Sequence, residues 1–224
     1  DRVLRGSEAA VDACIAQLLG GPRWPEKEYV IGQTTYATVY AMAAHLRACL
    51  GGRGEGMPVC VCAQDKAVMA AALLSALAGG PVLVVPYAFT PQVLEALRHL
   101  TGFQTIVSDL PRSMPSGVRC IQPKAGAEPW SSTEILTART SNSEWLRLFT
   151  GGSTGVPRMW TKTVCNLLAE TDSIVANYGV TPEDRVVATV SPNHIYGLLY
   201  AVLTPLLASA SVAGEIPSFP AEIE

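Results

Sequence analysis

The chain has 224 residues, of which 49% are hydrophobic and 16% are charged. This composition supports a sizeable buried core and argues against long disordered regions. The net charge is −3 and no basic run stands out, so we do not expect nucleic acid as a partner. No charged-then-apolar leader follows Asp1, and we therefore expect a cytoplasmic protein.

The six cysteines are scattered along the chain. Only two are close together, and the single residue between them is not the wider gap typical of zinc ligands. On a strand those two side chains would face the same side. We therefore expect reduced and mostly buried packing residues at Cys14, Cys49, Cys60, Cys62, Cys120 and Cys165.

The first part of the chain alternates between helical and strand patterns. Apolar spacing and end signals predict helices over residues 8–19, 36–50 and 66–77, and another that Thr90 and Pro91 open and that ends at Leu100. Short apolar runs predict strands over 57–63, 81–86 and 104–108. The fold class we expect is therefore α/β, with mainly parallel sheets flanked by helices. Residues 110–134 are rich in Pro, Ser and Gly and are expected to form a connection.

The second part continues with fewer, longer elements. We expect strands over residues 145–149, 159–163 and 184–189, and a helix over 166–178. A further helix is expected over 195–207, kinked before Pro205.

Two long stretches, 67–94 and 186–214, contain no Asp, Glu, Lys or Arg. The first is interrupted by Gly79, Gly80 and Pro81, and the second contains Asn193 and His194 together with two prolines. These residues are poorly suited to hydrocarbon, so we interpret each stretch as a buried helix beside a buried strand rather than a membrane span.

The most distinctive segment is LFTGGSTGVPRM, residues 148–159, which directly follows an apolar strand. Glycines let backbone amides approach a ligand, and successive amides form a concavity that binds anions. Hydroxyl groups and a nearby arginine add donors. The pattern is neither a Walker A loop nor a dinucleotide fingerprint, and a Gly/Ser-rich turn between two strands is the alternative. The candidate phosphate-binding residues are Thr150, Gly151, Gly152, Ser153, Thr154, Gly155 and Arg158.

This segment resembles the signature loop of the AMP-binding superfamily, which includes acyl-CoA synthetases, luciferases and nonribosomal-peptide adenylation domains. Gly151 stands where the family pattern has Ser, Arg158 replaces Lys, and Met159 replaces Gly. Residues 163–167 (TVCNL) resemble the Thr-His-x-Asn-Leu element, and residues 191–198 (SPNHIYGL) resemble the Pro-x-x-His-x-x-Gly block with one residue fewer before the His. A weaker likeness at 35–37 extends the resemblance over about residues 30–214.

The resemblance implies that the loop holds the β- and γ-phosphates of ATP, with Mg²⁺ on the phosphates. A carboxylic acid would attack the α-phosphate to form an acyl-adenylate. The acyl group would then pass to the thiol of coenzyme A or of the phosphopantetheine on an acyl carrier protein. It also implies that His194, Tyr196 and Gly197 border the acid pocket, although ordinary packing is the alternative for His194 and Tyr196.

Several parts of the family pattern have no counterpart in this sequence. They are the aromatic-Gly-x-Thr-Glu block, the ribose-binding Asp, the hinge, and the C-terminal domain with its catalytic Lys. Residues 1–224 are therefore expected to be an incomplete N-terminal AMP-binding domain that does not catalyse adenylation alone, with a first α/β subdomain over about 1–130 and a second part over 140–224. We assign no certain catalytic residue and no metal ligand to it. The alternatives are a degenerate homologue that binds nucleotide or acyl carrier without chemistry, and an unrelated phosphate-binding α/β domain.

Overall fold

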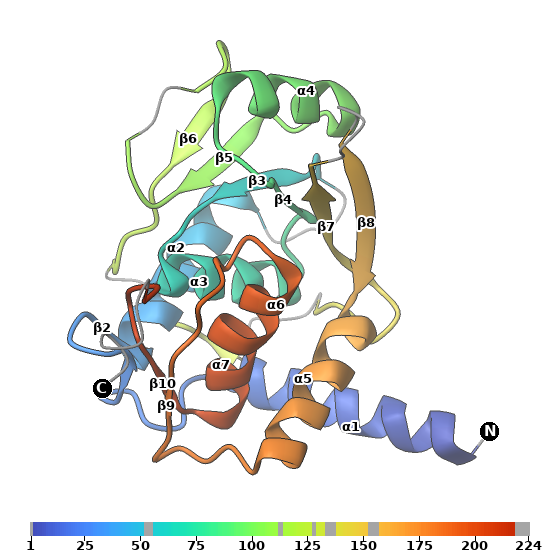
Figure 1. The fold of residues 1–224 in the computed structure, drawn as a ribbon, viewed down its shortest axis with the longest axis vertical. Coiled ribbons are helices and arrows are strands. Elements are labelled where there is room, and N and C mark those ends of the chain that lie inside the picture. Colours follow the sequence, from blue (N-terminus) through green and yellow to red (C-terminus); the bar gives the residue numbers. More distant parts are fainter. Residues whose placement is uncertain are drawn as a thin grey trace.

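The computed structural model describes residues 2–51, 56–111, 114–126, 129–132, 138–151 and 157–217, without the side chains of residues 2–7. Helices pack around two sheets (Figure 1). The helices are α1 (Arg2–Leu19), α2 (Tyr36–Leu50), α3 (Lys66–Leu77), α4 (Pro91–Thr101), α5 (Val164–Tyr178), α6 (Ile195–Leu198), the π-helix η2 (Leu199–Leu203) and α7 (Thr204–Ala208). The strands are β1 (Glu28–Val30), β2 (Thr34–Thr35), β3 (Val59–Cys62), β4 (Leu83–Val85), β5 (Thr105–Ser108), β6 (Arg119–Ile121), β7 (Glu144–Thr150), β8 (Arg158–Thr163), β9 (Arg185–Val186) and β10 (Ser211–Val212).

The larger sheet has six strands in the order β6-β5-β3-β4-β7-β8. All neighbours run parallel except β7 and β8, which form an antiparallel pair at one edge. This arrangement confirms the predicted α/β class with a mainly parallel sheet. The edge strand β6 falls inside the segment that was expected to be a connection. It escaped prediction because it has only three residues and two of them are exposed, which leaves no apolar run to detect.

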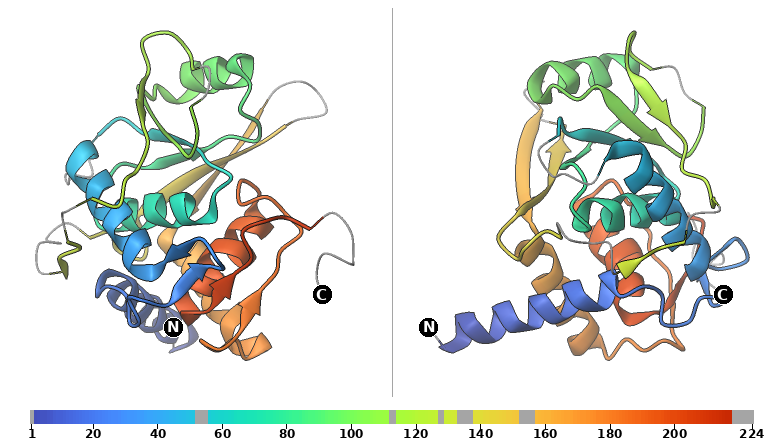
Figure 2. Two further views of the ribbon diagram at one scale, coloured as in Figure 1. Left: turned by 90° about the vertical axis from the view of Figure 1, so that its left-hand side faces the viewer. Right: turned by 180° about the vertical axis from the view of Figure 1, so that it is seen from behind.

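Helices cover both faces of this sheet, with α4 on one side and α2 and α3 on the other (Figures 1 and 2). Side chains alternate between the faces, as the period of a strand requires. Cys60, Cys62 and Val84 join the cluster under α4, whereas Val59 and Val61 join the main core. Because both faces of the central strands β3, β4 and β5 are covered, these strands are almost wholly buried, and short apolar runs predicted them.

The smaller sheet has the order β2-β1-β10-β9. The predicted strand at 184–189 shortens to β9, and the other three strands were not predicted. Each of these three strands is two or three residues long. Strands β1 and β10 pair with each other although they lie far apart in sequence, with Val30 opposite Val212. Both sheets therefore combine strands from either side of the predicted boundary between residues 130 and 140, so that boundary does not separate one sheet from the other.

The helix predicted over residues 195–207 is present as three consecutive helical segments, α6, η2 and α7, and its irregular segment lies just before Pro205, where a kink was expected. The segment η2 between α6 and α7 is a π-helix, and Pro205 lies in the first turn of α7. Proline supplies no N–H, so it frees a carbonyl of the preceding turn. Nearby hydroxyls bind carbonyls here: Tyr29 donates to Val202 at 3.0 Å and Tyr36 donates to Pro205 at 2.7 Å.

Helix α3 has the predicted bounds and is buried along its whole length. Its buried residues include Lys66, which is 1% exposed and donates from Nζ to the backbone carbonyls of Ala213, Gly214 and Glu215. Burial lowers the pKa of Lys66, and nearby Asp65 partly opposes that effect. A single side chain thus connects the start of α3 to the segment that follows β10.

Other predicted elements fit with small changes. Helix α1 begins at Arg2, earlier than expected, and α5 begins at Val164. The stretch 67–94 forms α3 and β4 and then leads into α4, as a buried helix beside a buried strand. Within the described ranges no helix combines the length and apolarity that a membrane crossing needs.

All six cysteines are free, as expected, and Cys60 and Cys62 face the same side with their sulfurs 3.8 Å apart. The expectation of mostly buried cysteines holds for these two and for Cys14. It is wrong for Cys120, which lies exposed on the edge strand β6, while Cys49 and Cys165 are partly buried.

Candidate active site

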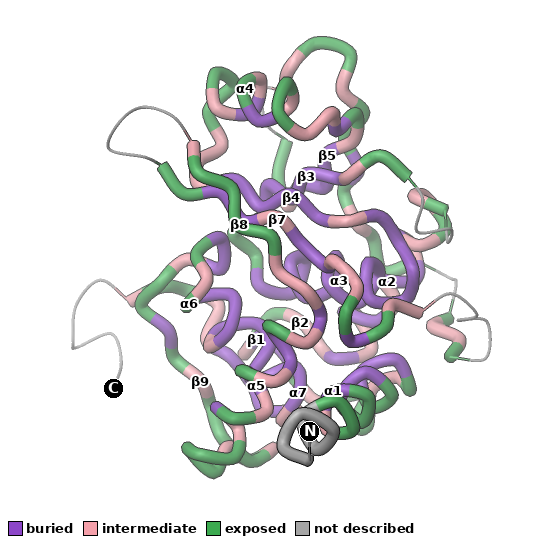
Figure 3. The backbone as a smooth tube through the Cα atoms, turned by 90° about the vertical axis from the view of Figure 1, so that its right-hand side faces the viewer, coloured by how far each residue is buried: buried purple, intermediate pink, exposed green. Residues whose placement is uncertain are grey.

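The phosphate-loop motif connects the antiparallel strands β7 and β8. Thr150, at the end of β7, lies directly opposite Arg158, the first residue of β8. Strand β7 is held in place by its buried residues, and β8 is the exposed edge beside it (Figure 3). The loop therefore leaves the sheet at the carboxyl end of β7, the edge at which ligands bind in open α/β sheets. The four predicted residues Gly152, Ser153, Thr154 and Gly155 lie outside the described residues.

Arg158 stacks on the indole ring of Trp160, two residues along the same face of β8, with its guanidinium carbon 4.2 Å from the ring centroid. Both side chains are exposed, and Trp160 retains 43% of its accessible surface. The stack holds the guanidinium at the base of the loop, where its planar donors are available to an anion.

Gly151 lies against the ring of Tyr87, which follows β4 by two residues. A Cβ atom added at Gly151 would lie 3.3 Å from two carbons of that ring, closer than most side-chain contacts. The family pattern has Ser at this position, and the neighbouring tyrosine gives a physical reason for the Gly. The aromatic ring thus takes the space that a side chain would occupy next to the phosphate loop.

The turn after β3 is held at the same edge of the sheet by Asp109. Its Oδ2 accepts hydrogen bonds from the backbone N–H groups of Gln64 at 2.7 Å and Asp65 at 3.0 Å. Asp65 in turn caps α3 by accepting from the N–H of Ala67 at 2.7 Å. These bonds fix the carboxyl end of β3 next to that of β5, which Asp109 directly follows.

The His block is connected to this edge through Asn193, which is 5% exposed. Its Nδ2 donates to the carbonyl of Ala63, just past β3, and to Ser191 Oγ, both at 3.1 Å. Its Oδ1 is buried and has no hydrogen-bond partner among the described residues. The block and the base of the phosphate loop therefore lie at the carboxyl ends of strands β3 and β7, with β4 between them.

The three predicted pocket residues occupy different environments at the start of α6. His194 is exposed and occupies the N-cap position without a side-chain capping bond. Tyr196 is 67% exposed, whereas Gly197 is buried. A Cβ at Gly197 would lie 1.9 Å from the carbonyl oxygen of Ser191, so only glycine fits. This contact accounts for the Gly of the motif by packing alone.

The TVCNL element forms a capping box at the start of α5. The N–H of Asn166 donates to Thr163 Oγ1, and the N–H of Thr163 donates to Asn166 Oδ1, both at 3.1 Å. Val164, where the family often has His, is fully buried. The element therefore fixes the angle at which the chain leaves β8.

The family profile described as "AMP-binding enzyme" matches residues 21–215. The chain belongs to this family. The sulfoacetate–CoA ligase of Cupriavidus necator (strain ATCC 17699) is 25% identical over 218 residues, which cover 85% of this chain and 42% of the ligase.

Solved structures with the same fold include two that contain ATP. ATP-bound MatB from Rhodopseudomonas palustris superposes with a TM-score of 0.72 at 20% identity, over 94% of this chain and 46% of MatB. The O-succinylbenzoate coenzyme A synthetase of Bacillus subtilis, solved with ATP and magnesium ion, gives 0.68 at 18% identity, over 94% and 59%. The AMP-binding chain thus spans about half the length of each of these three proteins.

Two residues of this AMP-binding chain were not identified from the sequence as parts of the site. Tyr87 follows the carboxyl end of a buried strand, and ligands of open α/β sheets bind at that end, so its position in the sequence could have indicated a site residue. Asn193 immediately precedes the candidate His194 in the motif, but only the tertiary contact with Ala63 shows what its side chain does. In the described residues, no group of three or more His, Cys, Asp or Glu side chains gathers as metal ligands.

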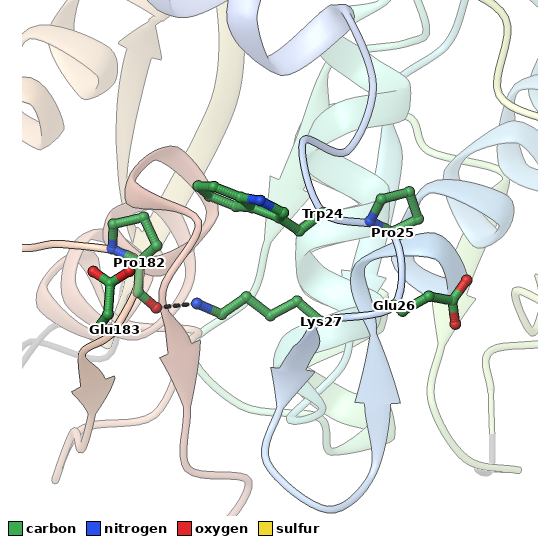
Figure 4. Close-up of a pocket in the computed structure, with 6 residues that line it drawn as sticks. All are labelled: Trp24, Pro25, Glu26, Lys27, Pro182 and Glu183. Carbon is green, nitrogen blue, oxygen red and sulfur yellow. Dashed lines mark hydrogen bonds between the residues drawn. The ribbon is translucent and has the colours of Figure 1, made fainter.

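A separate hollow of about 650 Å³ lies where the chain enters the smaller sheet (Figure 4). Trp24 and Lys27 precede β1 on one side, and Pro182 and Glu183 precede β9 on the other. Lys27 Nζ donates to the carbonyl of Pro182 across it. None of the predicted site residues lines this hollow, so its position adds nothing to the candidate active site.

Proposed function

We propose that this AMP-binding chain is the N-terminal part of a ligase that activates a carboxylic acid with ATP. The acid would form an acyl-adenylate and release pyrophosphate, and the acyl group would pass to a thiol. The observation that carries this proposal is the hydrogen bond from Asn193 to Ala63, because it brings the His block to the same sheet edge as the phosphate loop. Family membership and the likeness to coenzyme A ligases support it.

In this proposal the phosphate loop holds the β- and γ-phosphates of ATP. Thr150, Gly151, Gly152, Ser153, Thr154 and Gly155 supply backbone amides and hydroxyls, and Arg158 supplies charge. Its stack on Trp160 limits the freedom of the guanidinium, so less entropy is lost when a phosphate binds. Mg²⁺ would neutralise the phosphates, and positioning together with charge neutralisation would provide most of the catalysis.

His194, Tyr196 and Gly197 are proposed to border the acid pocket. His194 is exposed beside the buried Asn193, so its ring is accessible to a ligand at the sheet edge. Gly197 lets α6 start close to the backbone of Ser191 and so sets where that edge of the pocket lies. The acceptor would be coenzyme A or the phosphopantetheine of an acyl carrier protein, in the cytoplasm. Residues 1–224 alone are proposed to be inactive.

The test is carboxylate-dependent ATP–pyrophosphate exchange by the full-length product of the native gene, with fatty, aryl and amino acids. Exchange with one acid class supports the proposal and identifies the substrate class. Arg158→Gln should lower exchange by about tenfold or more, in line with the loss of a charged phosphate contact. Lys162→Gln is the matched control, because Lys162 lies on the same strand and face but further from the loop. Equal losses in the two variants would contradict the role of Arg158.

The second candidate is a degenerate homologue that binds nucleotide or acyl carrier without chemistry. This candidate is supported by two departures from the family's loop pattern, Arg158 in place of Lys and Met159 in place of the final Gly. It predicts that the full-length protein binds ATP but shows no exchange with any acid in the panel.

A further inference from the structure

A second hollow, of about 540 Å³, lies between α2 and the edge strand β6. Its lining includes Cys49 and His45 from α2, together with Arg119, Cys120 and Lys124 from β6 and the residues after it. None of its described lining residues is Asp or Glu, although the whole chain carries a net charge of −3. Cys49 therefore lies in a hollow whose described permanent charges are positive. Cys120 is in register with Ile106 and Cys60, so its side chain lies on the opposite face of the sheet, under α4.

The hollow is remote from the candidate active site along the sheet. Strand β6 is one edge of the six-stranded sheet, and β8, which carries Arg158, is the opposite edge. The inference below therefore does not depend on the proposed function.

Cys49 has two polar neighbours. His45 Nε2 lies 3.7 Å from its sulfur, one helical turn earlier on α2. The buried Nδ1 of His45 has no partner among the described residues, so the proton of the neutral ring is better placed on Nε2, facing the sulfur. The thiolate of Cys49, which is the reacting form of the thiol, would accept this N–H.

Arg119 offsets the negative end of the helix at Cys49. Carbonyl groups at a helix C-terminus disfavour an anion, and Cys49 is the penultimate residue of α2. Arg119 donates from Nη1 to the carbonyl of Cys49 at 3.3 Å. A guanidinium has five N–H donors, so this bond leaves donors for an anionic ligand in the hollow.

We propose that Cys49 is a site of reversible S-thiolation by a small anionic disulfide, of which glutathione disulfide is a representative. The thiolate of Cys49 attacks one sulfur of the disulfide, and a new S–S bond forms as the old one breaks. The released half leaves as a thiolate and takes up the proton that Cys49 gave up. Arg119 and Lys124 attract the carboxylates of the reagent, and the disulfide itself is the only oxidant.

The thiol of Cys120, on the neighbouring strand β6, is the less favoured nucleophile. Burial raises the pKa of Cys120, with Cys62 adding to the effect, so less of it is thiolate at neutral pH. Because it is more exposed than Cys49, modification governed by access alone would favour Cys120. The position of the first mixed disulfide therefore distinguishes a built site from simple exposure.

The first experiment treats the intact chain with glutathione disulfide and maps the mixed disulfides by mass spectrometry of peptides. We expect Cys49 to be modified before Cys120 and Cys165, and dithiothreitol to reverse the modification. Faster modification of either of the other two thiols, or an intramolecular disulfide without bound glutathione, would overturn the proposal.

The second experiment tests the role of charge in a Cys120→Ser, Cys165→Ser background, where the remaining thiols besides Cys49 are buried. Rates are compared for an anionic reagent, 5,5′-dithiobis(2-nitrobenzoate), and a neutral one, 2,2′-dithiodipyridine. Adding Arg119→Gln and Lys124→Gln should slow the anionic reagent about three- to tenfold and change the neutral rate less than about twofold.

Raised salt should reproduce that selective loss without any change at the two cationic residues, since screening weakens attraction between exposed charges. This measurement remains decisive if the charge variants fold poorly. Equal slowing of both reagents, or no salt dependence with the anionic one, would show that the cations do not guide the reagent.

Discussion

Replacing Gly197 by Ala tests the packing at the start of α6. The added Cβ would lie 1.9 Å from the carbonyl oxygen of Ser191, 2.5 Å from its carbonyl carbon and 2.8 Å from the carbonyl oxygen of Val190. Ordinary contact begins at 3.4 Å, so the two segments must separate by 3.4 − 1.9, or about 1.5 Å. Every atom that the Cβ meets is backbone, and no side-chain rotation can relieve the contact.

The expected cost follows from these contacts. Overpacking a well-packed interior typically costs about 1–3 kcal/mol and occasionally more. Ala gains up to about 1 kcal/mol over Gly within a helix, which offsets part of that cost. Because the clash is severe and wholly with backbone, we expect a net loss of about 2 kcal/mol in the free energy of unfolding. The separation would also strain the bond from Asn193 to Ala63.

The assay is urea unfolding of the intact chain, followed by tryptophan fluorescence and circular dichroism. Gly126→Ala is the matched control, because a Cβ at Gly126 meets nothing within 4 Å and its φ is not positive. We expect that control to stay within about 0.5 kcal/mol of the parent. If Gly197→Ala also stays within that range with an unchanged urea slope, α6 does not start against the backbone of Ser191 and the reasoning is refuted.

Three further predictions concern contacts elsewhere in the structure. Gly151→Ser should cost about 1 kcal/mol through its contact with the Tyr87 ring, and Tyr87→Leu should remove most of that penalty in a double-mutant cycle of urea midpoints. Asn193→Leu should cost about 1–3 kcal/mol, because it leaves the carbonyl just past β3 without its donor; a melting temperature equal to that of the parent would contradict this. Asp184 accepts hydrogen bonds from the N–H and hydroxyl of Thr181, which hold its pKa below the ordinary 3.8. Because the pKa of Asp184 is lower in the folded than in the unfolded chain, its ionised carboxylate stabilises the fold above about pH 4. That contribution is lost as the pH falls through the folded-state pKa. Asp184→Asn should therefore reduce the acid sensitivity of the urea midpoint between about pH 5 and pH 2, and an unchanged pH profile would be evidence against the shift.

Local patterns in the sequence were sufficient for the central strands of the larger sheet. Strands β3, β4, β5 and β7 are buried on both faces, so each appears as an apolar run, and the helices between them have their own end signals. Asp65 and Thr90 cap α3 and α4 through contacts made within a few residues. The side shared by Cys60 and Cys62 followed from the period of a strand alone. The loop motif likewise could be recognised because its glycines and hydroxyls are contiguous in sequence.

Only the tertiary structure decided the features that depend on residues far apart in the chain. Strands β1 and β10 are too short to carry a pattern, and each is fixed by its partner across the smaller sheet. Gly151 is adjacent to Tyr87 because the parallel strands β4 and β7 bring their carboxyl ends together. Asn193 contacts Ala63 from the segment before α6, across a sequence separation of 130 residues. The sequence thus determined which segments could form strands, helices and a phosphate loop, since those properties depend on neighbouring residues. The arrangement of the candidate site depends on contacts between remote segments, whose energies no local pattern records.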